Sequence, residues 1–329
     1  MNRQALNKHI LVTGGAGYLG SVTCEILLCA GYQVRALDCL MYSGRPLLGL
    51  VRPGFSFVNG DVCDAQVVDQ ALEDIDAVIH LAAVVGDPAC AREPKLAKEV
   101  NYSATVQLFR LASERGVEQV VFASTCSNYG KMSESESYVN EDSALAPVSL
   151  YAETKVAAEK ELLSASKDAS SAVTVLRFAT LFGLSPRMRF DLTVNEFTKE
   201  LMTKRSLVVY GEQFWRPYVH VRDAARAIAL VLDSPKEKIA GKVFNVGDTT
   251  QNYQKKGIIE LVRSQISGEL EIQSVHKEED PRDYRVSFER IQQVLGFNIT
   301  TTVKAGISEI ASAISQGIFS KFDESEYRN

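Results

Sequence analysis

A tyrosine and a lysine four residues apart are the side chains in this sequence best suited to acid–base chemistry. If Tyr151 and Lys155 lie on a helix, they share one face, because residues i and i+4 are neighbours there. A nearby cation favours a phenolate, so Lys155 is expected to lower the pKa of Tyr151 and make it a proton acceptor. Thr125 ends an apolar run upstream, and its hydroxyl could relay a proton or hold a reacting oxygen. An exposed tyrosine beside a solvated lysine would give the same spacing, so the pair needs a second signal.

That signal lies near the N-terminus, where an apolar run passes through three spaced glycines into a helical stretch. Gly14 permits a tight turn, Gly17 lets the backbone approach a pyrophosphate at the helix N-terminus, and Gly20 lets helix and strand pack closely. Tyr18 and Leu19 stand at this helix start and belong to the predicted cofactor site. An ordinary strand–helix turn is the alternative that the glycines alone leave open.

A second strand-like run ends in Asp38, about 20 positions after the glycines. A carboxylate at this place accepts hydrogen bonds from an adenosine ribose and repels a 2′-phosphate. The glycines and Asp38 therefore predict NAD as the cofactor, in preference to NADP.

Further motifs follow in order along the chain: Asp61-Val62, His80-Leu81-Ala82-Ala83, Asn101, and the segment from Arg216 to Asp223. With the glycines and the Tyr-x-x-x-Lys pair, they resemble the extended short-chain dehydrogenase/reductase family, in its NAD-dependent sugar-nucleotide epimerase/dehydratase branch. The resemblance runs from about Lys8 to about Phe297 and implies that Thr125, Tyr151 and Lys155 are catalytic. It places the cofactor against Gly14, Gly17, Tyr18, Leu19, Asp38, Asp61, Val62, Leu81, Ala82, Ala83, Asn101, Tyr151 and Lys155.

The resemblance also implies a nucleoside-diphosphate sugar as the substrate. The net charge of the chain is -5, so local arginines must meet the diphosphate. The family's arginine at the position of Arg216 contacts this group, and a planar guanidinium suits bidentate phosphate binding. Arg187 and Arg282 are further candidates, for which a structural salt bridge is the alternative. The predicted sugar pocket also includes Val84, Thr125, Cys126 and Ser127.

The two positions after Thr125 separate neighbouring activities. Family dehydratases carry Asp-Glu there as acid and base for eliminating water, whereas this chain has Cys126 and Ser127. An elimination without that pair loses two groups that each contribute about 10²–10⁴-fold. Cys126 is interpreted as a wall of the sugar pocket, with a catalytic thiol as the other possibility. The family's usual valine is replaced by Asn128, which could add a hydrogen-bonding group near the sugar.

Apolar strand-like runs alternate with helical patterns through the first half of the chain. This alternation predicts an α/β fold, a Rossmann-like doubly wound parallel sheet with both faces covered by helices. We expect an NAD-binding domain over residues 1–182 and a smaller, mixed, mainly substrate-binding lobe over 183–329. Residues 221–250 are expected to return to the first domain. The predicted helices are near 64–73, 93–115, 150–167, 191–203 and 257–266.

The composition of the chain limits which partners, metals and cellular locations are expected. Apolar residues make up 46% of the chain and charged residues 23%, and the acidic balance gives no reason to expect nucleic acid or an anionic membrane as a partner. The 6 cysteines show no metal-binding spacing, which predicts reduced thiols, no metal and a cytoplasmic location. A homodimer is expected from the resemblance, with Leu108, Leu111, Val156 and Leu163 at its interface. The alternative is that these side chains only cover the sheet.

These observations predict an NAD-dependent sugar-nucleotide 4-epimerase that works through a transient 4-keto sugar. A C4 dehydrogenase or 4-keto reductase of a hexose or heptose nucleotide uses the same residues and remains open. A dehydratase is disfavoured by the residues after Thr125. A non-catalytic NAD-binding regulator is disfavoured because Thr125, Tyr151 and Lys155 are all present.

Overall fold

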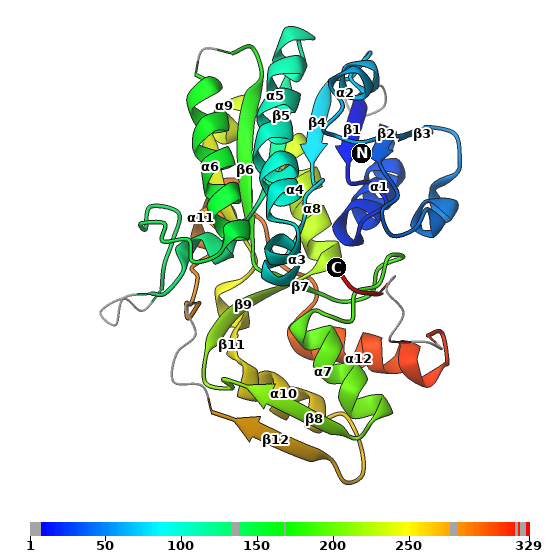
Figure 1. Ribbon diagram of the computed structural model, residues 1–329, viewed down its shortest axis with the longest axis vertical. Helices are drawn as coiled ribbons and strands as arrows, with labels where there is room; N and C mark the ends of the chain where they lie inside the picture. Colours follow the sequence, from blue (N-terminus) through cyan, green and yellow to red (C-terminus); the bar gives the residue numbers. More distant parts are fainter. Residues whose placement is uncertain (1–7, 133–137, 168, 277–281, 320–321, 323–326) are drawn as a thin grey trace.

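The computed structural model describes residues 8–132, 138–167, 169–276, 282–319, 322 and 327–329. A large parallel sheet with helices on both faces forms the upper part in Figure 1, and a smaller group of helices and short strands lies below it. The α/β, doubly wound fold with a smaller mixed lobe is thus confirmed.

The main sheet has 7 strands in the order β10-β6-β5-β4-β1-β2-β3. Every neighbouring pair in it is parallel. The chain order reverses between β1 and β4, and in such sheets ligands bind at the carboxyl ends of the strands beside that point. The strands are β1 (His9–Thr13), β2 (Gln33–Asp38), β3 (Phe55–Asn59), β4 (Ala77–His80), β5 (Gln119–Thr125), β6 (Ala172–Phe178) and β10 (Lys242–Val246).

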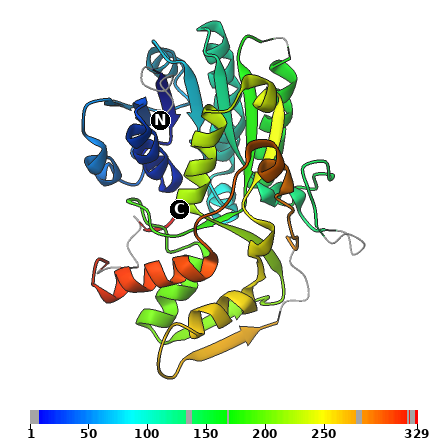
Figure 2. The same ribbon diagram turned by 180° about the vertical axis from the view of Figure 1, so that it is seen from behind.

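Alternate residues of each strand face two separate cores. Ile10 and Val12 pack with α1 (Tyr18–Ala30) and α8 (Val221–Leu232), which lies in front of the sheet in Figure 2. Leu11 points the other way, toward a core that helices α2, α5 and α6 cover. Burial on both sides explains why the strands read as continuous apolar runs. These helices are α2 (Ala65–Ala71), α5 (Thr105–Glu114) and α6 (Leu150–Ala165).

The helix predicted near 93–115 is interrupted. It consists of α4 (Pro94–Lys98), a π-helical stretch η3 (Glu99–Ala104) and α5. Such π segments occur frequently at functional sites, and this one contains Asn101.

The smaller lobe is built around a third core, which includes Phe182, Phe197 and Ile307. Its helices are α7 (Thr193–Thr203), α10 (Lys255–Arg263) and α12 (Val303–Ser315). Its strands form a parallel pair, β8 (Ser206–Tyr210) with β12 (Glu271–Val275), and a sheet in which β9 (Trp215–His220) lies between β11 (Asn252–Gln254) and β7 (Thr180–Phe182). The short elements that remain are η2 (Arg45–Leu50), α3 (Asp87–Arg92), η4 (Cys126–Tyr129), α9 (Lys236–Ile239), η5 (Thr249–Gln251) and α11 (Glu289–Leu295).

The four apolar side chains predicted for a dimer interface pack largely against other residues of the same chain. Leu108, Leu111 and Val156 are 1%, 9% and 6% exposed, and Leu163 packs against the core beneath α5 and α6. These side chains cover the sheet, the alternative that the sequence left open, and their place at a dimer interface stays a prediction.

The described residues contain neither a membrane-spanning helix nor a cluster of metal ligands. None of their helices has the length and apolar character needed to cross a membrane. Among the same residues, no group of three or more His, Cys, Asp or Glu side chains is arranged to hold a metal ion. All 6 cysteines are free thiols.

The contact between β1 and α1 depends on Gly20. A Cβ atom at this position would lie 2.0 Å from the carbonyl oxygen of Gly14. Neither the Cβ nor this backbone oxygen can move away by rotating a side chain. A Cβ at Gly49 would meet nothing within 4 Å.

Gly20→Ala should therefore lower the free energy of unfolding by about 1–3 kcal/mol, the usual cost of overpacking. Gly49→Ala serves as the matched control and should leave stability nearly unchanged. The midpoint of denaturant unfolding checks both variants. Equal midpoints for Gly20→Ala and the unmodified protein would show that the backbone accommodates the methyl group.

Candidate active site

The backbone at the end of β1 forms a cradle in which no side chain fits. Gly14 has φ +71, and a Cβ there would lie 2.8 Å from the amide nitrogen of Ala82. Gly17 is the N-cap of α1 and has no side chain to cap its amides. Helix N-termini of this kind bind phosphate groups through free N–H groups and the helix dipole. The predicted role of the glycines thus has a geometric basis.

Asp38 ends β2 beside this cradle. Its carboxylate accepts hydrogen bonds from the amides of Ala16 at 3.0 Å and Leu40 at 2.8 Å. Burial raises the pKa of Asp38, whereas the two amide donors and the charge of Arg187 lower it. The carboxylate that should select a ribose over its 2′-phosphate is therefore fixed in place by the backbone on either side.

Arg187 lies on this cofactor side of the site, contrary to its predicted role at the substrate diphosphate. Its guanidinium stacks over the ring of Tyr42 at 4.1 Å and donates to the carbonyl of Arg328 at 2.9 Å. The residue is 4% exposed and interacts electrostatically with Asp38. No local sequence signal separates Arg187 from the other arginines, because side-chain direction in a loop depends on the tertiary fold.

Tyr18 uses its side chain to join the two lobes. Its hydroxyl donates to the carbonyl of Gly183 at 2.6 Å and accepts from Asn195 at 3.2 Å, while its own carbonyl accepts from Ser185 at 2.7 Å. Tyr18 and Leu19 could therefore bind a phosphate through their backbone amides at the start of α1.

The other predicted cofactor residues lie at the ends of β3 and β4. Asp61 is exposed and accepts from the amide of Cys63 at 2.9 Å, and Val62 is buried in the core. Beyond β4, the amide of Ala82 donates to the hydroxyl of Thr13 at 3.3 Å. The loop residues Leu81, Ala82, Ala83 and Val84 are partly buried.

Asn101 is fully buried and supports this loop from behind. Its side chain accepts from the amide of Val84 at 2.8 Å and donates to the carbonyl of the same residue at 3.0 Å. It also lies 3.4 Å from the hydroxyl of Thr154, next to Lys155. These contacts tie the loop after β4 to α6, and the predicted contact of Asn101 with the cofactor stays a prediction.

The predicted Tyr-x-x-x-Lys helix is present as α6, and the side chain of Ser149 caps its N-terminus. Lys155 is 2% exposed, donates to the carbonyl of Ala123 at 2.9 Å, and lies 4.7 Å from the centre of the Phe122 ring. Burial lowers the pKa of Lys155 to about 8, and the charge of Glu159 opposes that shift. The pKa of Lys155 therefore lies in the pH range in which enzymes commonly work.

Tyr151 differs from the expectation. Burial raises its pKa, and the group that lowers it most is Arg189 rather than Lys155. The ammonium of Lys155 is directed to the carbonyl of Ala123, which explains why it has little effect on the phenol. The prediction that Lys155 lowers the pKa of Tyr151 is therefore wrong for the protein without a bound cofactor.

The groups that act electrostatically on Tyr151 identify residues that sequence reasoning missed. Asp87, Cys90 and Tyr284 raise its pKa, and Arg189 lowers it. Asp87 and Cys90 follow the His-Leu-Ala-Ala motif by a few positions, and Arg189 and Tyr284 each stand two positions after a predicted arginine. Proximity to these motifs was the only available signal.

The segment after Thr125 turns into the protein. The hydroxyl of Thr125 accepts from the amide of Ser127 at 3.1 Å and caps η4. Cys126 is 1% exposed, and its thiol donates to the carbonyl of Arg177 at 3.2 Å. Burial raises the pKa of Cys126 well above its usual value, which excludes a ready nucleophile. Asn128 is fully buried, and its side-chain amide donates to Glu159 at 2.7 Å.

Arg216 and Arg282 gather around Tyr284, whose pKa both of them lower. Arg216 lies 5.5 Å from the centre of the Tyr284 ring and is 8% exposed. Arg282 donates to Asp87 at 2.6 Å, an ion pair between the smaller lobe and α3. The hydroxyl of Tyr284 lies 3.4 Å from that of Ser127, which connects this cationic region to the end of β5.

A dinucleotide cradle and a buried Tyr–Lys pair at the carboxyl ends of one parallel sheet define a Rossmann-type NAD-dependent enzyme of the short-chain dehydrogenase/reductase class. A sequence model of the NAD dependent epimerase/dehydratase family matches residues 10–247. The chain belongs to this family.

Both dehydratases and epimerases are found among the relatives of this chain. The chain is 30% identical to a dTDP-glucose 4,6-dehydratase of Streptomyces niveus, over 92% of this chain and 91% of the relative. It is also 30% identical to a UDP-glucose 4-epimerase of Halalkalibacterium halodurans, over 88% and 90%. The crystal structure of a Thermus thermophilus UDP-glucose 4-epimerase in complex with NAD superposes with a TM-score of 0.80 at 26% identity, covering 94% of this chain and 100% of that chain.

Replacing Asp38 tests the cofactor preference. The unmodified protein should bind NAD at least about tenfold more tightly than NADP, because a 2′-phosphate would face the carboxylate. Asp38→Asn keeps the side-chain oxygen and removes the charge, so the ratio of the two dissociation constants should fall toward one. Calorimetric titration with both nucleotides measures it. Equal affinities in the unmodified protein would contradict the assignment.

Proposed function

We propose that this protein is an NAD-dependent 4-epimerase of a nucleoside-diphosphate sugar. The observation that carries the choice is the direction of the residues after Thr125. The thiol of Cys126 turns into the core, the hydroxyl of Ser127 lies 3.4 Å from that of Tyr284, and neither of these two positions after Thr125 carries a carboxylate. The site thus keeps its hydride-transfer residues without the acid and base that an elimination requires.

The reaction begins with loss of the proton from the C4 hydroxyl of the sugar. Tyr151 accepts this proton as a phenolate and returns it in the second half of the reaction. Thr125, at the end of β5, holds the C4 oxygen or relays the proton. We assign Lys155 to the hydroxyls of the nicotinamide ribose, and its ammonium also donates to the carbonyl of Ala123, two residues before Thr125. Oriented groups of this kind contribute through proximity as well as acid–base chemistry.

NAD, when bound, supplies the hydride acceptor and donor at C4 and adds positive charge near the phenol. Gly14, Gly17 and the amides at the start of α1 would hold its pyrophosphate, and Asp38 its adenosine ribose. The 4-keto sugar must turn over within the pocket before the hydride returns to its other face. The protein therefore has to retain both the cofactor and the diphosphate through the whole cycle.

Arg216 and Arg282 are the groups we assign to the diphosphate. Both lie near Tyr284 and Ser127, on the substrate side of Tyr151. Binding there would replace the contact of Arg282 with Asp87 by one with phosphate oxygens. Arg187 is assigned to the cofactor side, because it interacts with Asp38.

A C4 dehydrogenase or 4-keto reductase is the second candidate, since it would use the same Thr125, Tyr151 and Lys155. A dehydratase is less well supported. Asp87, the carboxylate that acts on Tyr151, is already paired with Arg282 at 2.6 Å, and Glu159 is buried against Arg177. The equal identity to an epimerase and a dehydratase does not separate the two activities.

A homodimer and a cytoplasmic location remain predictions. If a dimer forms through α5 and α6, exposed side chains such as Tyr102 would contribute to it beside Leu163, because Leu108, Leu111 and Val156 are buried.

Incubation with a panel of nucleotide hexoses tests the proposed function. An epimerase should give two interconverting sugars of identical mass and no net NADH, read by mass spectrometry, NMR and absorbance of the reduced cofactor. A product two mass units lighter, formed in step with NADH, would indicate the dehydrogenase. A product lighter by one water would refute the argument from Cys126 and Ser127.

Tyr151→Phe should lower turnover by about 10²-fold or more, because it removes the acid–base hydroxyl and keeps the ring. Affinity for NAD should change little. Steady-state kinetics and NAD titration measure the two quantities on the same preparation. Near-normal turnover in the Phe variant would mean that the proton is transferred by another group.

A further inference from the structure

A buried ion pair lies behind the catalytic helix, between Glu159 on α6 and Arg177 on β6. Glu159 is 1% exposed and Arg177 is 5% exposed. The guanidinium Nε lies 3.2 and 3.1 Å from the two carboxylate oxygens, and Nη2 lies 2.8 Å from Oε2. Because both charges must be desolvated, a buried pair of this kind is weak evidence for added stability. Its other contacts suggest what it does.

The Glu159 carboxylate also binds the residues on both sides of Thr125. The hydroxyl of Ser124 donates to its Oε1, and the side-chain amide of Asn128 donates to the same oxygen at 2.7 Å. Ser124 is the residue before Thr125 on β5, and Asn128 lies in the turn η4 that follows. One carboxylate therefore fixes the strand end and the turn between which the Thr125 hydroxyl is presented.

Glu159 stands one helical turn after Lys155, and Lys155 one turn after Tyr151. Its charge opposes the effect of burial on Lys155. The other ionisable groups facing the ammonium are Cys90 on α3, which also raises the pKa of Lys155, and His80 on β4. Burial lowers the pKa of His80 to about 3, so it is neutral. Glu159 is thus the charged carboxylate that acts on Lys155.

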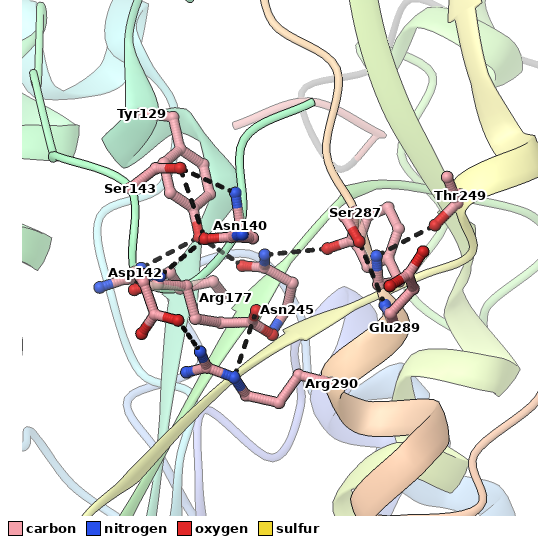
Figure 3. Close-up of polar contacts among 12 residues, drawn as sticks. Tyr129, Asn140, Asp142, Ser143, Arg177, Asn245, Thr249, Ser287, Glu289 and Arg290 are labelled. Atoms are coloured by element: carbon pink, nitrogen blue, oxygen red, sulfur yellow. Dashed lines mark hydrogen bonds and ion pairs between the residues drawn. The ribbon is translucent and has the colours of Figure 1, made fainter. Parts of the chain in front are cut away.

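Hydrogen bonds continue from Arg177 to Tyr129, Asn245 and Ser287, which Figure 3 shows as sticks. Nη1 of Arg177 donates to the hydroxyl of Tyr129 at 3.0 Å, and this hydroxyl donates to Asn245 at 2.8 Å. The side-chain amide of Asn245 donates to the carbonyl of Ser287 at 3.2 Å. The segment that contains Ser287 also carries Tyr284 three positions earlier, so both walls of the site are tied to one polar network.

We propose that Glu159 is a positioning residue for proton transfer at Tyr151: it fixes the strand end that presents Thr125 against the helix that carries Tyr151 and Lys155, and its charge faces the Lys155 ammonium. The inference rests on the proposed function for the identity of the transferred proton. Asn128 extends the arrangement with a donor that the family's usual valine lacks.

Three variants separate charge from packing. Glu159→Gln keeps the size of the side chain and removes its charge. The double variant Glu159→Gln/Arg177→Gln removes both charges, so that no guanidinium is left buried without a carboxylate if the single variant fails to fold. Glu159→Asp keeps the charge and shortens its reach to Ser124 and Asn128. Glu161→Gln makes the same chemical change at an exposed position of α6 and is the matched control.

The readouts are NAD affinity and kcat, each measured across pH 6–10. In the unmodified protein, NAD binding should weaken above about pH 8, where Lys155 loses its proton. Without the Glu159 charge the Lys155 pKa falls, so this midpoint should move to lower pH by about one unit in Glu159→Gln. The shift should have the same direction and be smaller in the double variant, because the positive charge of Arg177 is lost as well. Glu159→Asp should keep the midpoint and lower kcat about tenfold, because Thr125 is no longer held in place. Glu161→Gln should match the unmodified protein in the pH midpoint of NAD binding and in kcat.

An unchanged midpoint in folded Glu159→Gln or in the double variant would overturn the inference, as would an equal shift in Glu159→Asp. Full kcat in Glu159→Asp would overturn its positioning part. NAD binding needs no sugar substrate, so these results stand even if the protein fails to interconvert any nucleotide sugar. That failure would count against the proposed function alone.

Discussion

The buried ammonium of Lys155 is the constraint on which the site depends. An isolated charge of this kind is costly to desolvate, and the surrounding elements each offset part of the cost. The carbonyl of Ala123, the face of the Phe122 ring and the carboxylate of Glu159 come from β5 and α6. Because the same strand ends in Thr125 and the same helix begins near Tyr151, stabilising the lysine also sets the relative placement of the other two groups.

The main sheet could be predicted from the sequence because its physical requirements are local. A strand buried on both faces must be a continuous apolar run, and a glycine must stand where a Cβ would meet the backbone, as at Gly14 and Gly20. The spacing of Tyr151 and Lys155 also follows from one helix. Each of these features can be recognised without knowing what lies across the fold.

Side-chain direction could not be predicted, because it depends on partners distant in sequence. Arg187 is directed to Tyr42 and Asn128 to Glu159, and nothing local to either residue shows this. Strand β9 is also hard to recognise from the sequence, because Pro217 argues against a central strand. In the structure β9 pairs with β11 up to Pro217 and with β7 only from Tyr218 onward, so no neighbour requires the missing amide.

The placement of β10 has a consequence for how the chain folds during synthesis. Strand β6 pairs with β5 on one side and with β10 on the other, and α8 covers α1. Both late elements follow β7, β8 and β9 and the helix α7 of the smaller lobe. Until they emerge from the ribosome, β6 has an unpaired edge and α1 an uncovered apolar face, the features that favour aggregation of folding intermediates. The strand order therefore delays completion of the dinucleotide-binding half until much of the other lobe has been made.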